Sequence, residues 1–174
     1  SAWRGEPIGN VNGKDIYLSP APLQTPHPPL WVAAFGPLAI RQAGSLGLPY
    51  IASPVEGIDG LKTNVEQHRQ HVMDAGHPPV TVTPIMRTVF ITENSQVEKR
   101  ARDSLKTESK GRVIGGEVDL DDWAIVGGKD YVKDKLHEYQ DTLGLNYLIA
   151  RGRIAGIEND EQIRSHELLN SIVS

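Results

Sequence analysis

Short apolar segments alternate with helix-like segments along most of this 174-residue chain. Four apolar or β-branched segments, each short enough for one strand, cover residues 30–35, 49–53, 80–91 and 146–151. After each of them, apolar residues recur every three or four positions, which is the spacing of one helix face. Such an alternation predicts an α/β fold with parallel strands and right-handed crossovers. A chain of this length can also bury one sizeable core.

The first 29 residues do not share this alternation and are rich in Gly and Pro. Asn12 and Gly13 stand between two short β-prone pieces, a pattern typical of a tight β-hairpin. The prolines that follow favour extended backbone over helix. We therefore expect two parts: a hairpin with an extended insertion segment in residues 1–29, and four strand–helix units in residues 30–174.

The first three helix-like segments carry their own start and stop signals. Residues 37–46 begin with Pro37, and proline is favoured at the first helical position. Residues 61–72 have one apolar helix face, and Gly76 is a suitable end for that helix. Residues 92–106 begin with cap-type residues and continue with apolar residues at helical spacing.

The second half of the chain predicts two more helices. Four residues at helical spacing predict a stripe that faces the sheet: Val132, Leu136, Tyr139 and Leu143. Gly144 ends this helix. Asn159 with Gln162 resembles a capping box for a last helix that ends near Val173. The polar, Gly-containing residues between 106 and 122 predict an irregular stretch.

Composition excludes several classes of protein. The net charge of −4 gives no broad basic surface for nucleic acid or membranes. The chain has no cysteine, which excludes a disulfide framework, a thiolate metal site and a cysteine nucleophile. No apolar run approaches the ~20 residues of a membrane span. We expect a cytoplasmic protein with no nucleic-acid or membrane partner.

Metal and hydrolase chemistry find little support in the sequence. The six histidines include no pair with the spacing of HExxH or of a zinc finger. His68 and His71 lie one helical turn apart, either on a half-buried helix face or as part of a metal site. Because no third ligand is evident, we favour the helix face and expect no metal. Neither a GxSxG elbow nor a Ser-His-Asp order is present.

One turn is unusually abrupt. In PPLWVAAFGPLAIRQAG, residues 28–44, the chain passes from strand to helix with only Gly36 and Pro37 between them. Glycine lets a ligand approach the backbone, and a helix N-terminus carries partial positive charge. Together these features favour an anion, most often phosphate. The alternative is that this turn is an ordinary strand–helix connection.

Three segments together resemble the luciferase-like monooxygenase family of bacteria, whose members use FMN or the deazaflavin F420. These segments are residues 2–29, residues 28–51 (PPLWVAAFGPLAIRQAGSLGLPYI) and residues 123–157 (WAIVGGKDYVKDKLHEYQDTLGLNYLIARGRIAGI). In order and spacing they are similar to the family's approach to its fifth strand, that strand with its helix, and its late helix with the eighth strand. The resemblance implies the C-terminal half of a (β/α)8 TIM barrel, strands five to eight with a preceding hairpin. It also implies that residues 125–132, IVGGKDYV, are the start of a helix packed outside the barrel.

The resemblance also implies a cofactor-binding turn. In the family, the turn after the fifth strand helps to hold the cofactor phosphate. Carried over, the cofactor-binding residues are Ala34, Phe35, Gly36, Pro37 and Leu38. The amides of Phe35, Gly36 and Leu38 are then the expected donors, since proline has none. Phe35 replaces the Ser or Thr often found in the family, and Leu48-Pro49 replaces its Asp-Gly pair.

Two further residues belong to the cofactor-binding set that the resemblance implies. Ser53 ends the second strand and Arg151 ends the fourth, so both are expected at the ligand end of a barrel. Arginine suits phosphate or carboxylate recognition through its planar fork. The alternative for Arg151 is a surface salt bridge with Glu158 or Asp160.

The resemblance implies a flavin-dependent oxidoreductase or monooxygenase that uses reduced FMN, or alternatively F420, on a small organic substrate. It identifies no catalytic residue in this chain. Because the first four strands of the family barrel have no counterpart here, we expect a homo-oligomer or pairing with a missing N-terminal half. The rival hypothesis is a non-catalytic half-barrel fragment that self-associates as a structural or ligand-binding module.

Overall fold

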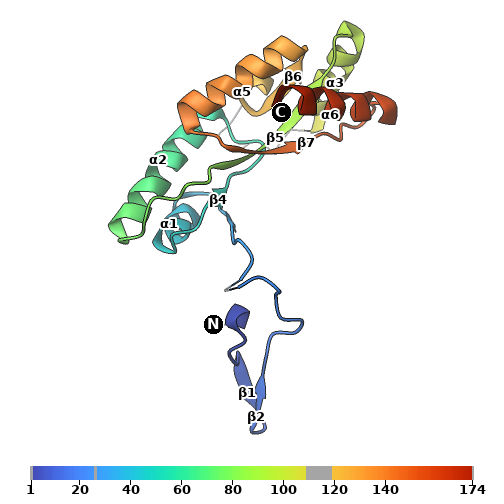
Figure 1. Cartoon of the computed structure of the whole chain (residues 1–174). Helices are drawn as coiled ribbons and strands as arrows, with labels where there is room; N and C mark the ends of the chain where they lie inside the picture. The colour runs from blue at the N-terminus through green and yellow to red at the C-terminus, as the bar shows by residue number, and fades with distance from the viewer. Residues whose placement is uncertain (1, 26, 109–118, 174) are drawn as a thin grey trace. The chain divides into compact units, whose positions relative to one another are not determined.

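The computed structural model describes residues 2–25, 27–108 and 119–173. Contacts divide the chain into two compact units, Ser1–Trp31 and Val32–Ser174. The smaller unit contains a short 3-10 helix, η1 (Ala2–Arg4), and the antiparallel strands β1 (Gly9–Val11) and β2 (Lys14–Ile16) (Figure 1).

The hairpin of the smaller unit turns at Asn12 and Gly13, as the sequence predicts. Both residues have positive φ, 51° and 76°, which suits the two-residue turns that match strand twist. The Asn10 side chain supports the turn by accepting from the Gly13 amide at 3.0 Å and by donating to Asp15 at 2.7 Å. The predicted hairpin is therefore confirmed.

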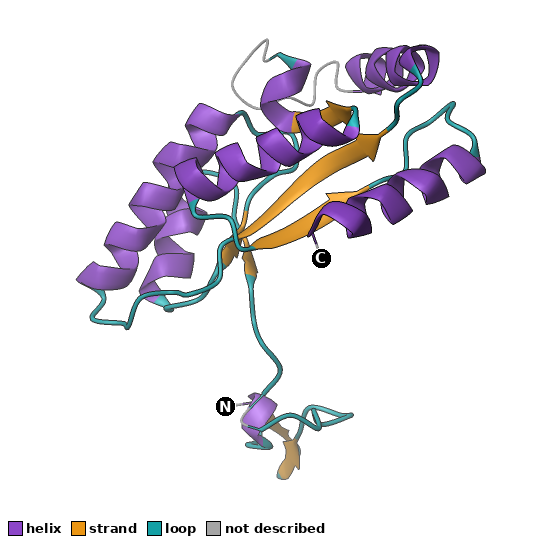
Figure 2. Ribbon diagram, turned by 45° about the horizontal axis from the view of Figure 1, so that its top comes forward, coloured by secondary structure: helices purple, strands orange, loops and turns teal. Residues whose placement is uncertain are grey.

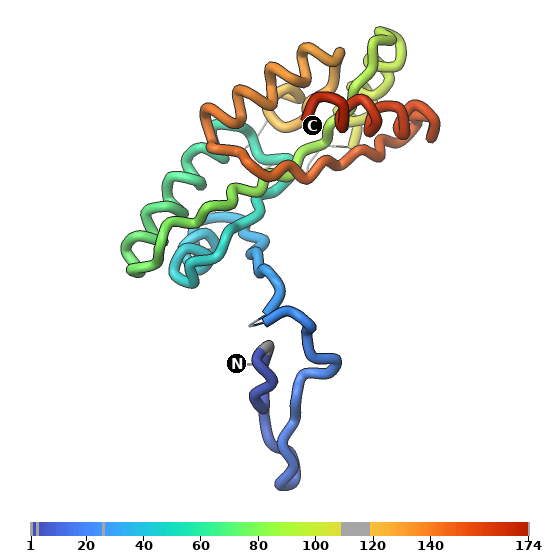
Figure 3. The backbone as a smooth tube through the Cα atoms, in the orientation of Figure 1, coloured from blue at the N-terminus to red at the C-terminus, as the bar shows by residue number. Residues whose placement is uncertain are grey.

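The larger unit is built on parallel strands. They are β3 (Val32–Ala33), β4 (Tyr50–Ile51), β5 (Pro84–Ile91), β6 (Ala124–Gly127) and β7 (Tyr147–Arg151). β3 pairs with β4, and β5 pairs with both β6 and β7, all in parallel. β4 also contacts β5, and β5 and β7 run side by side (Figure 3). The four predicted strands are therefore present and parallel, with shorter ends than expected.

β6 corrects one prediction, because residues 125–132 do not start as a helix. Ala124–Gly127 pair with Thr88–Ile91 of β5, and all four β6 residues are buried. The helix begins only after Gly128. A four-residue apolar run has no periodicity of its own to distinguish strand from helix. Its partner β5 lies more than thirty residues earlier in the chain, so tertiary pairing decides the conformation.

In the described residues of the larger unit, six α-helices accompany these strands (Figure 2). They are α1 (Pro37–Ser45), α2 (Ile58–Asp74), α3 (Ser95–Glu108), α4 (Leu120–Trp123), α5 (Lys129–Leu143) and α6 (Asn159–Val173). Most of the predicted irregular stretch, residues 109–118, lies outside the described residues. Among the described residues, no helix is long and apolar enough to cross a membrane.

The main core lies between the sheet and helices α1, α2 and α5. Ile85 and Val89 of β5 belong to the same buried cluster as Leu61 and Val65 of α2. The predicted stripe of α5 joins it, since Val132, Leu136, Tyr139 and Leu143 are all buried there. Gly144 ends α5 in the left-handed conformation, as predicted. A second cluster surrounds Phe90 under α3.

The opposite face of the sheet is less covered. Side chains alternate between the two faces of a strand, and Met86 and Ile149 are paired positions that point away from the main core. Both are only half-buried, and so is Ile51 of β4. α3 covers this face at the carboxyl end of β5, around Phe90. The rest of it is apolar and only partly covered, and we call it the open face: the half-buried Ile51, Met86 and Ile149 and the exposed Ala33.

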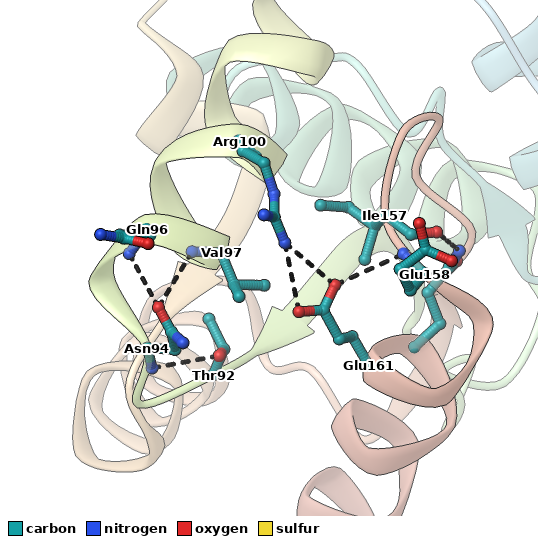
Figure 4. A network of polar contacts seen from close by, with 9 residues as sticks. Thr92, Asn94, Gln96, Val97, Arg100, Ile157, Glu158 and Glu161 are labelled. Atoms are coloured by element: carbon teal, nitrogen blue, oxygen red, sulfur yellow. Dashed lines mark hydrogen bonds and ion pairs between the residues drawn. The ribbon is translucent and has the colours of Figure 1, made fainter.

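A polar network joins α3 to α6 near the carboxyl end of β5 (Figure 4). Asn94 caps α3, since its side-chain oxygen accepts from the amides of Gln96 and Val97 at 3.0 and 3.3 Å. One Arg100 nitrogen lies 3.2 Å from each carboxylate oxygen of Glu161. Both partners are partly exposed, so this ion pair, which links α3 to α6, adds little stability.

The start of α6 differs from the predicted capping box. Gln162 does not bond back to Asn159; its side chain donates to the Ile157 carbonyl at 2.8 Å and accepts from the Ile154 amide at 3.0 Å. Glu161 instead accepts from the Glu158 amide, at 3.4 Å. The sequence pattern could not separate these registers, because acidic and amide side chains occupy adjacent positions there.

Candidate functional site

The predicted cofactor turn follows β3 directly. Ala34 is buried, and its amide continues the strand ladder by donating to the Ile51 carbonyl at 3.2 Å. Gly36 has φ 88° and ψ 170°, a conformation that is essentially restricted to glycine. α1 begins at Pro37, in the first helical position. The abrupt strand-to-helix switch in the sequence is therefore real, and glycine is required there by the backbone.

Three amides at this turn have no protein partner. In the part of the chain that the structure describes, the N–H groups of Phe35, Gly36 and Leu38 form no hydrogen bond. The first intrahelical bond runs from the Ile40 amide to the Gly36 carbonyl at 3.2 Å. Gly36 and Leu38 occupy the first positions of the helix, where N–H groups have no partner within the helix, and Phe35 comes just before them. They are available to an acceptor from outside.

The surroundings of the turn favour an anion. A side chain built on Gly36 would meet nothing within 4 Å, so the space beside its backbone is free. The first turn of α1 carries no acidic residue that would oppose the positive end of the helix. The side chains of Phe35 and Leu38 are 60% and 83% exposed. The turn therefore offers backbone donors between two exposed apolar side chains.

Ser53 lies beside this turn. β3 and β4 pair with Ala33 opposite Ile51, so Phe35 and Ser53 follow at equal steps beyond the two strand ends. Ser53 is buried, and its hydroxyl accepts from the Val55 amide at 3.4 Å within its own loop. The structure thus brings Ser53 next to the predicted turn, with its hydroxyl engaged in the β4–α2 loop.

A buried cation holds the β4–α2 loop in place. Arg87 of β5 is fully buried, and its guanidinium donates to the carbonyls of Ser53 and Pro54, both at 3.3 Å, and of Glu56 at 2.7 Å. It also donates to the Tyr139 hydroxyl at 3.1 Å. The loop beside the predicted turn is therefore built around one arginine, which sequence reasoning did not assign to the site.

Glu56 brings a carboxyl group to the same loop. Its side chain accepts a hydrogen bond from the Asn64 amide group. Burial raises the pKa of the Glu56 carboxyl, against the opposing effects of the nearby Arg87 charge and the Asn64 hydrogen bond. Glu56 therefore combines partial burial with a raised pKa at the carboxyl edge of the sheet, as functional-site carboxyl groups often do.

Arg151 lies apart from the turn. It ends β7, is exposed, and pairs in register with Thr88. The turn follows β3, which pairs with β4, whereas β7 pairs with β5 in another hydrogen-bonded sheet. In the described structure, Arg151 forms no ion pair with Glu158 or Asp160, so the alternative salt bridge is not present.

The histidine pair of α2 has a structural role at His68. His68 is buried, and its Nε2 lies 2.8 Å from the Leu48 carbonyl, which holds α2 against the α1–β4 connection. Within the described residues, no group of three His, Cys, Asp or Glu side chains is arranged to hold a metal ion.

Comparison with known proteins gives a family match and several similar structures. The family described as luciferase-like monooxygenase matches residues 1–146. No match is found among curated proteins. Monooxygenase RslO1 from Streptomyces bottropensis is similar in structure, with a TM-score of 0.78 and 16% identity, over 99% of this chain and 56% of that one.

Two other solved structures have different cofactors in their descriptions. The oxygenating constituent of 3,6-diketocamphane monooxygenase from Pseudomonas putida, solved with FMN, has a TM-score of 0.66 and 20% identity, over 98% of this chain and 58% of that one. The coenzyme F420-dependent tetrahydromethanopterin reductase from Methanopyrus kandleri has a TM-score of 0.60 and 14% identity, over 98% and 58%.

The chain thus spans little more than half the length of these three structures. At such low identities the likeness establishes the fold alone: a mixed α/β unit with parallel strands that matches part of a luciferase-like TIM barrel. The family match is independent of this likeness and covers most of the sequence. The chain therefore belongs to the luciferase-like monooxygenase family.

Proposed function

We propose that this chain is part of a flavin-dependent oxidoreductase and holds the phosphate of reduced FMN, or alternatively of F420, at residues 35–38. The observation that carries the proposal is the set of three unpaired amides, on Phe35, Gly36 and Leu38, at the start of α1. Family membership supports it, as does the FMN in the Pseudomonas putida structure. The Methanopyrus kandleri reductase supports F420 as the alternative.

The residues of the turn fit a phosphate group. Phosphate oxygens accept hydrogen bonds, and the turn presents donors in an orientation typical of anion sites at helix starts. The free space beside Gly36 allows close approach to the backbone. Phe35 cannot add the hydroxyl that Ser or Thr would offer, so binding depends on the backbone and on the helix N-terminus.

The proposed roles of the other residues follow from their positions. A bound reduced flavin supplies the electrons for oxygenation or hydride transfer. Ser53 and the Arg87-supported loop form the wall beside the phosphate, and the exposed side chains of Phe35 and Leu38 exclude water from its flanks. Arg151, at the end of β7 in the other sheet, would contact a different part of the cofactor or an anionic group of a small organic substrate.

The chain's organisation completes the proposal. We infer that residues 30–174 supply strands five to eight of the barrel, preceded by the hairpin and extended segment of residues 1–29. β3 pairs only with β4 in the described structure, and β7 pairs only with β5, so each has a free edge. The open face is apolar and half-exposed. Free edges and an exposed apolar face are the surfaces that closure of a barrel would cover.

The partner that covers the open face is proposed to be the other half of the barrel. The share of each relative that this chain matches leaves room for it, since over 40% of their length lies outside the match. A second copy of this chain is the alternative partner, as in the rival hypothesis of a non-catalytic, self-associating module. The cytoplasmic location stays a prediction.

Replacing Leu38 by glutamate tests the phosphate site. Leu38 is 83% exposed, so the new carboxylate would lie beside the turn without disturbing the core. Repulsion between like charges should weaken FMN binding by about tenfold, while Leu38→Gln, of the same size but neutral, should change it by less than about twofold. The measurement is a fluorescence titration of FMN with the full-length protein that contains these residues.

The stability of the fold is the control for this experiment. A glutamate in the first turn of a helix is favourable, so thermal unfolding of Leu38→Glu should be unchanged or slightly raised. Gly36→Val would be a poor substitute, because φ at Gly36 is positive and the variant would be strained whatever its effect on binding. Equal FMN affinities for the Glu and Gln variants would contradict the proposal.

A spectrum and an intact mass separate the enzyme from the rival module. Full-length protein that carries flavin, or that oxidises reduced flavin when substrate is added, supports the enzyme. A native protein whose mass equals this chain or its dimer, with no uptake of FMN or F420, supports the non-catalytic module.

A further inference from the structure

Arg151 lies on the same side of the sheet as the open face. Leu148 and Ala150 of β7 pack against the main core, and successive side chains of a strand point to opposite faces. Ile149 and Arg151 are therefore on the side away from that core. Arg151 is also the last residue of β7, so it stands at the carboxyl end of its strand, which is the ligand end of a barrel.

Thr88 of β5 is the neighbour of Arg151 on this side. The two residues are register partners in the parallel pair of β5 and β7, which run side by side (Figure 3). Val89 belongs to the main core, which places Thr88 on the opposite side, with Arg151. Neighbouring strands lie about 4.8 Å apart, so a hydroxyl and a guanidinium at paired positions can reach one ligand group.

Both polar groups lack a partner in the part of the chain that the structure describes. Arg151 is exposed, and its guanidinium forms no ion pair or hydrogen bond there. Thr88 is only 4% exposed, and its hydroxyl forms no hydrogen bond either. Among the described side chains, the Tyr50 hydroxyl alone is both unpaired and closed off, so the Thr88 hydroxyl keeps accessible surface. Since buried polar groups are nearly always hydrogen-bonded, this hydroxyl calls for an acceptor from outside.

The chemistry of the two groups favours a carboxylate as that acceptor. The planar fork of arginine pairs with a carboxylate through two parallel N–H bonds, and a hydroxyl can donate to a remaining lone pair. No described acidic side chain pairs with Arg151, so one full positive charge is available. A single cation balances the single charge of a carboxylate. The phosphate of the cofactor already has its proposed place at residues 35–38.

The apolar neighbours of this pair suit a hydrocarbon body. Met86 and Ile149 are register partners two positions nearer the amino ends of β5 and β7, and both are half-buried. They lie on the same side of the sheet as Thr88 and Arg151, because side chains two apart share a face. A ligand there would meet polar donors at one end and apolar side chains at the other, which selects a molecule with one anionic end.

We propose that Arg151 and Thr88 bind the carboxylate of the substrate, a small hydrocarbon acid whose apolar body lies against Met86 and Ile149. This inference rests on the proposed function, because it assigns the pair to the substrate space of a flavin enzyme. The binding is non-covalent. A fixed carboxylate end would decide which part of the hydrocarbon body can reach the reduced flavin.

A matched pair of probes tests the proposal. Cyclohexanecarboxylate carries the charge, and cyclohexanecarboxamide has the same shape without it. Both are titrated by NMR into the full-length protein that contains these residues. The carboxylate should bind the wild type, with cross-peaks from its ring to the methyl groups of Met86 and Ile149. Arg151→Gln should weaken the carboxylate about tenfold and change the carboxamide by less than about twofold. Thr88→Val, of the same shape, should weaken the carboxylate about threefold.

The control variant removes the same charge from another place. Arg164 is exposed on α6, whose buried Leu169 belongs to the main core on the other side of the sheet. Arg164→Gln should therefore leave the carboxylate affinity unchanged. Arg151 is exposed and unpaired in the described structure, so Arg151→Gln should unfold at the same temperature as the wild type.

A titration of FMN separates the substrate from the cofactor. Arg151→Gln should bind FMN as tightly as the wild type, and the carboxylate should still bind when FMN is present. The proposal is overturned if Arg151→Gln loses FMN about tenfold, or if FMN displaces the carboxylate, since the arginine would then serve the cofactor. Equal carboxylate affinities for the wild type and Arg151→Gln, or cross-peaks to other residues, overturn it too. Failure of the proposed function would show separately, as a wild type that binds no FMN.

Discussion

Arg87 is the residue on which the candidate site depends most. Its guanidinium is fully buried, and its hydrogen-bond partners in the described structure are neutral oxygens: backbone carbonyls and the Tyr139 hydroxyl. Burying a charge without a directly bonded carboxylate is costly, and several hydrogen bonds to the charged group are needed to offset the lost hydration. These same hydrogen bonds hold the β4–α2 loop in one position.

Removing this cation should loosen the loop and the fold together. Arg87→Met leaves the carbonyls of Ser53, Pro54 and Glu56 without their donor, so the free energy of unfolding should fall by about 3 kcal/mol. Urea denaturation measures the loss, and hydrogen exchange should show faster exchange in residues 53–57. Arg100→Met, which removes an exposed arginine, should lose less than about 1 kcal/mol. Equal losses in the two variants would show that Arg87 has no special role.

Single residues also mark the limit of prediction from sequence. The Gly36-Pro37 turn was predictable, because proline fixes the first helical position and glycine permits a sharp turn. The positive φ of Gly36 was not, since glycine takes either sign with similar ease. The role of Arg87 was not predictable either, because which face a strand residue occupies depends on register and on distant partners.

At the scale of elements, α5 shows how a periodic stripe specifies packing. Val132, Leu136, Tyr139 and Leu143 recur at helical spacing, and all four are buried against the sheet. The pattern suffices because fifteen residues give four turns of repeated signal. β6 is the contrasting case: four apolar residues fit a strand or a helix equally, and only pairing with β5 distinguishes them.

The α5 stripe can be tested by truncation. Leu136 is 8% exposed, so Leu136→Ala should reduce the free energy of unfolding by about 2–5 kcal/mol through lost burial and a new cavity. Leu38→Ala makes the same chemical change at a position that is 83% exposed, and it should alter stability by less than about 0.5 kcal/mol. Urea denaturation of both variants is the measurement. A loss under about 1 kcal/mol for Leu136→Ala would mean that the stripe is not core.

The larger unit, seen as a whole, has parallel strands with the main core and its helices on one face. On the other face, α3 covers only the carboxyl end, and the open face occupies the rest. Alternation in the sequence was enough to predict the parallel strands, since strand–helix–strand connections leave few other arrangements. The pairing of β6 depends on β5, which is distant in the sequence, and the cap of α6 depends on which of several neighbouring polar side chains bonds the backbone. A single sequence does not decide either. The proposed site consists of backbone amides, which every residue except proline has, so side-chain types alone could not locate it. The Gly36-Pro37 turn and the family resemblance located it instead.

The central claim is that the amides of residues 35, 36 and 38 hold the phosphate of a flavin. FMN and riboflavin differ by that phosphate alone, so comparing them in the full-length protein isolates its contribution. An amide NMR titration should show FMN, in its reduced form, shifting the Phe35, Gly36 and Leu38 resonances and binding at least tenfold tighter than reduced riboflavin. Equal affinities, with these three resonances unmoved, would contradict the account.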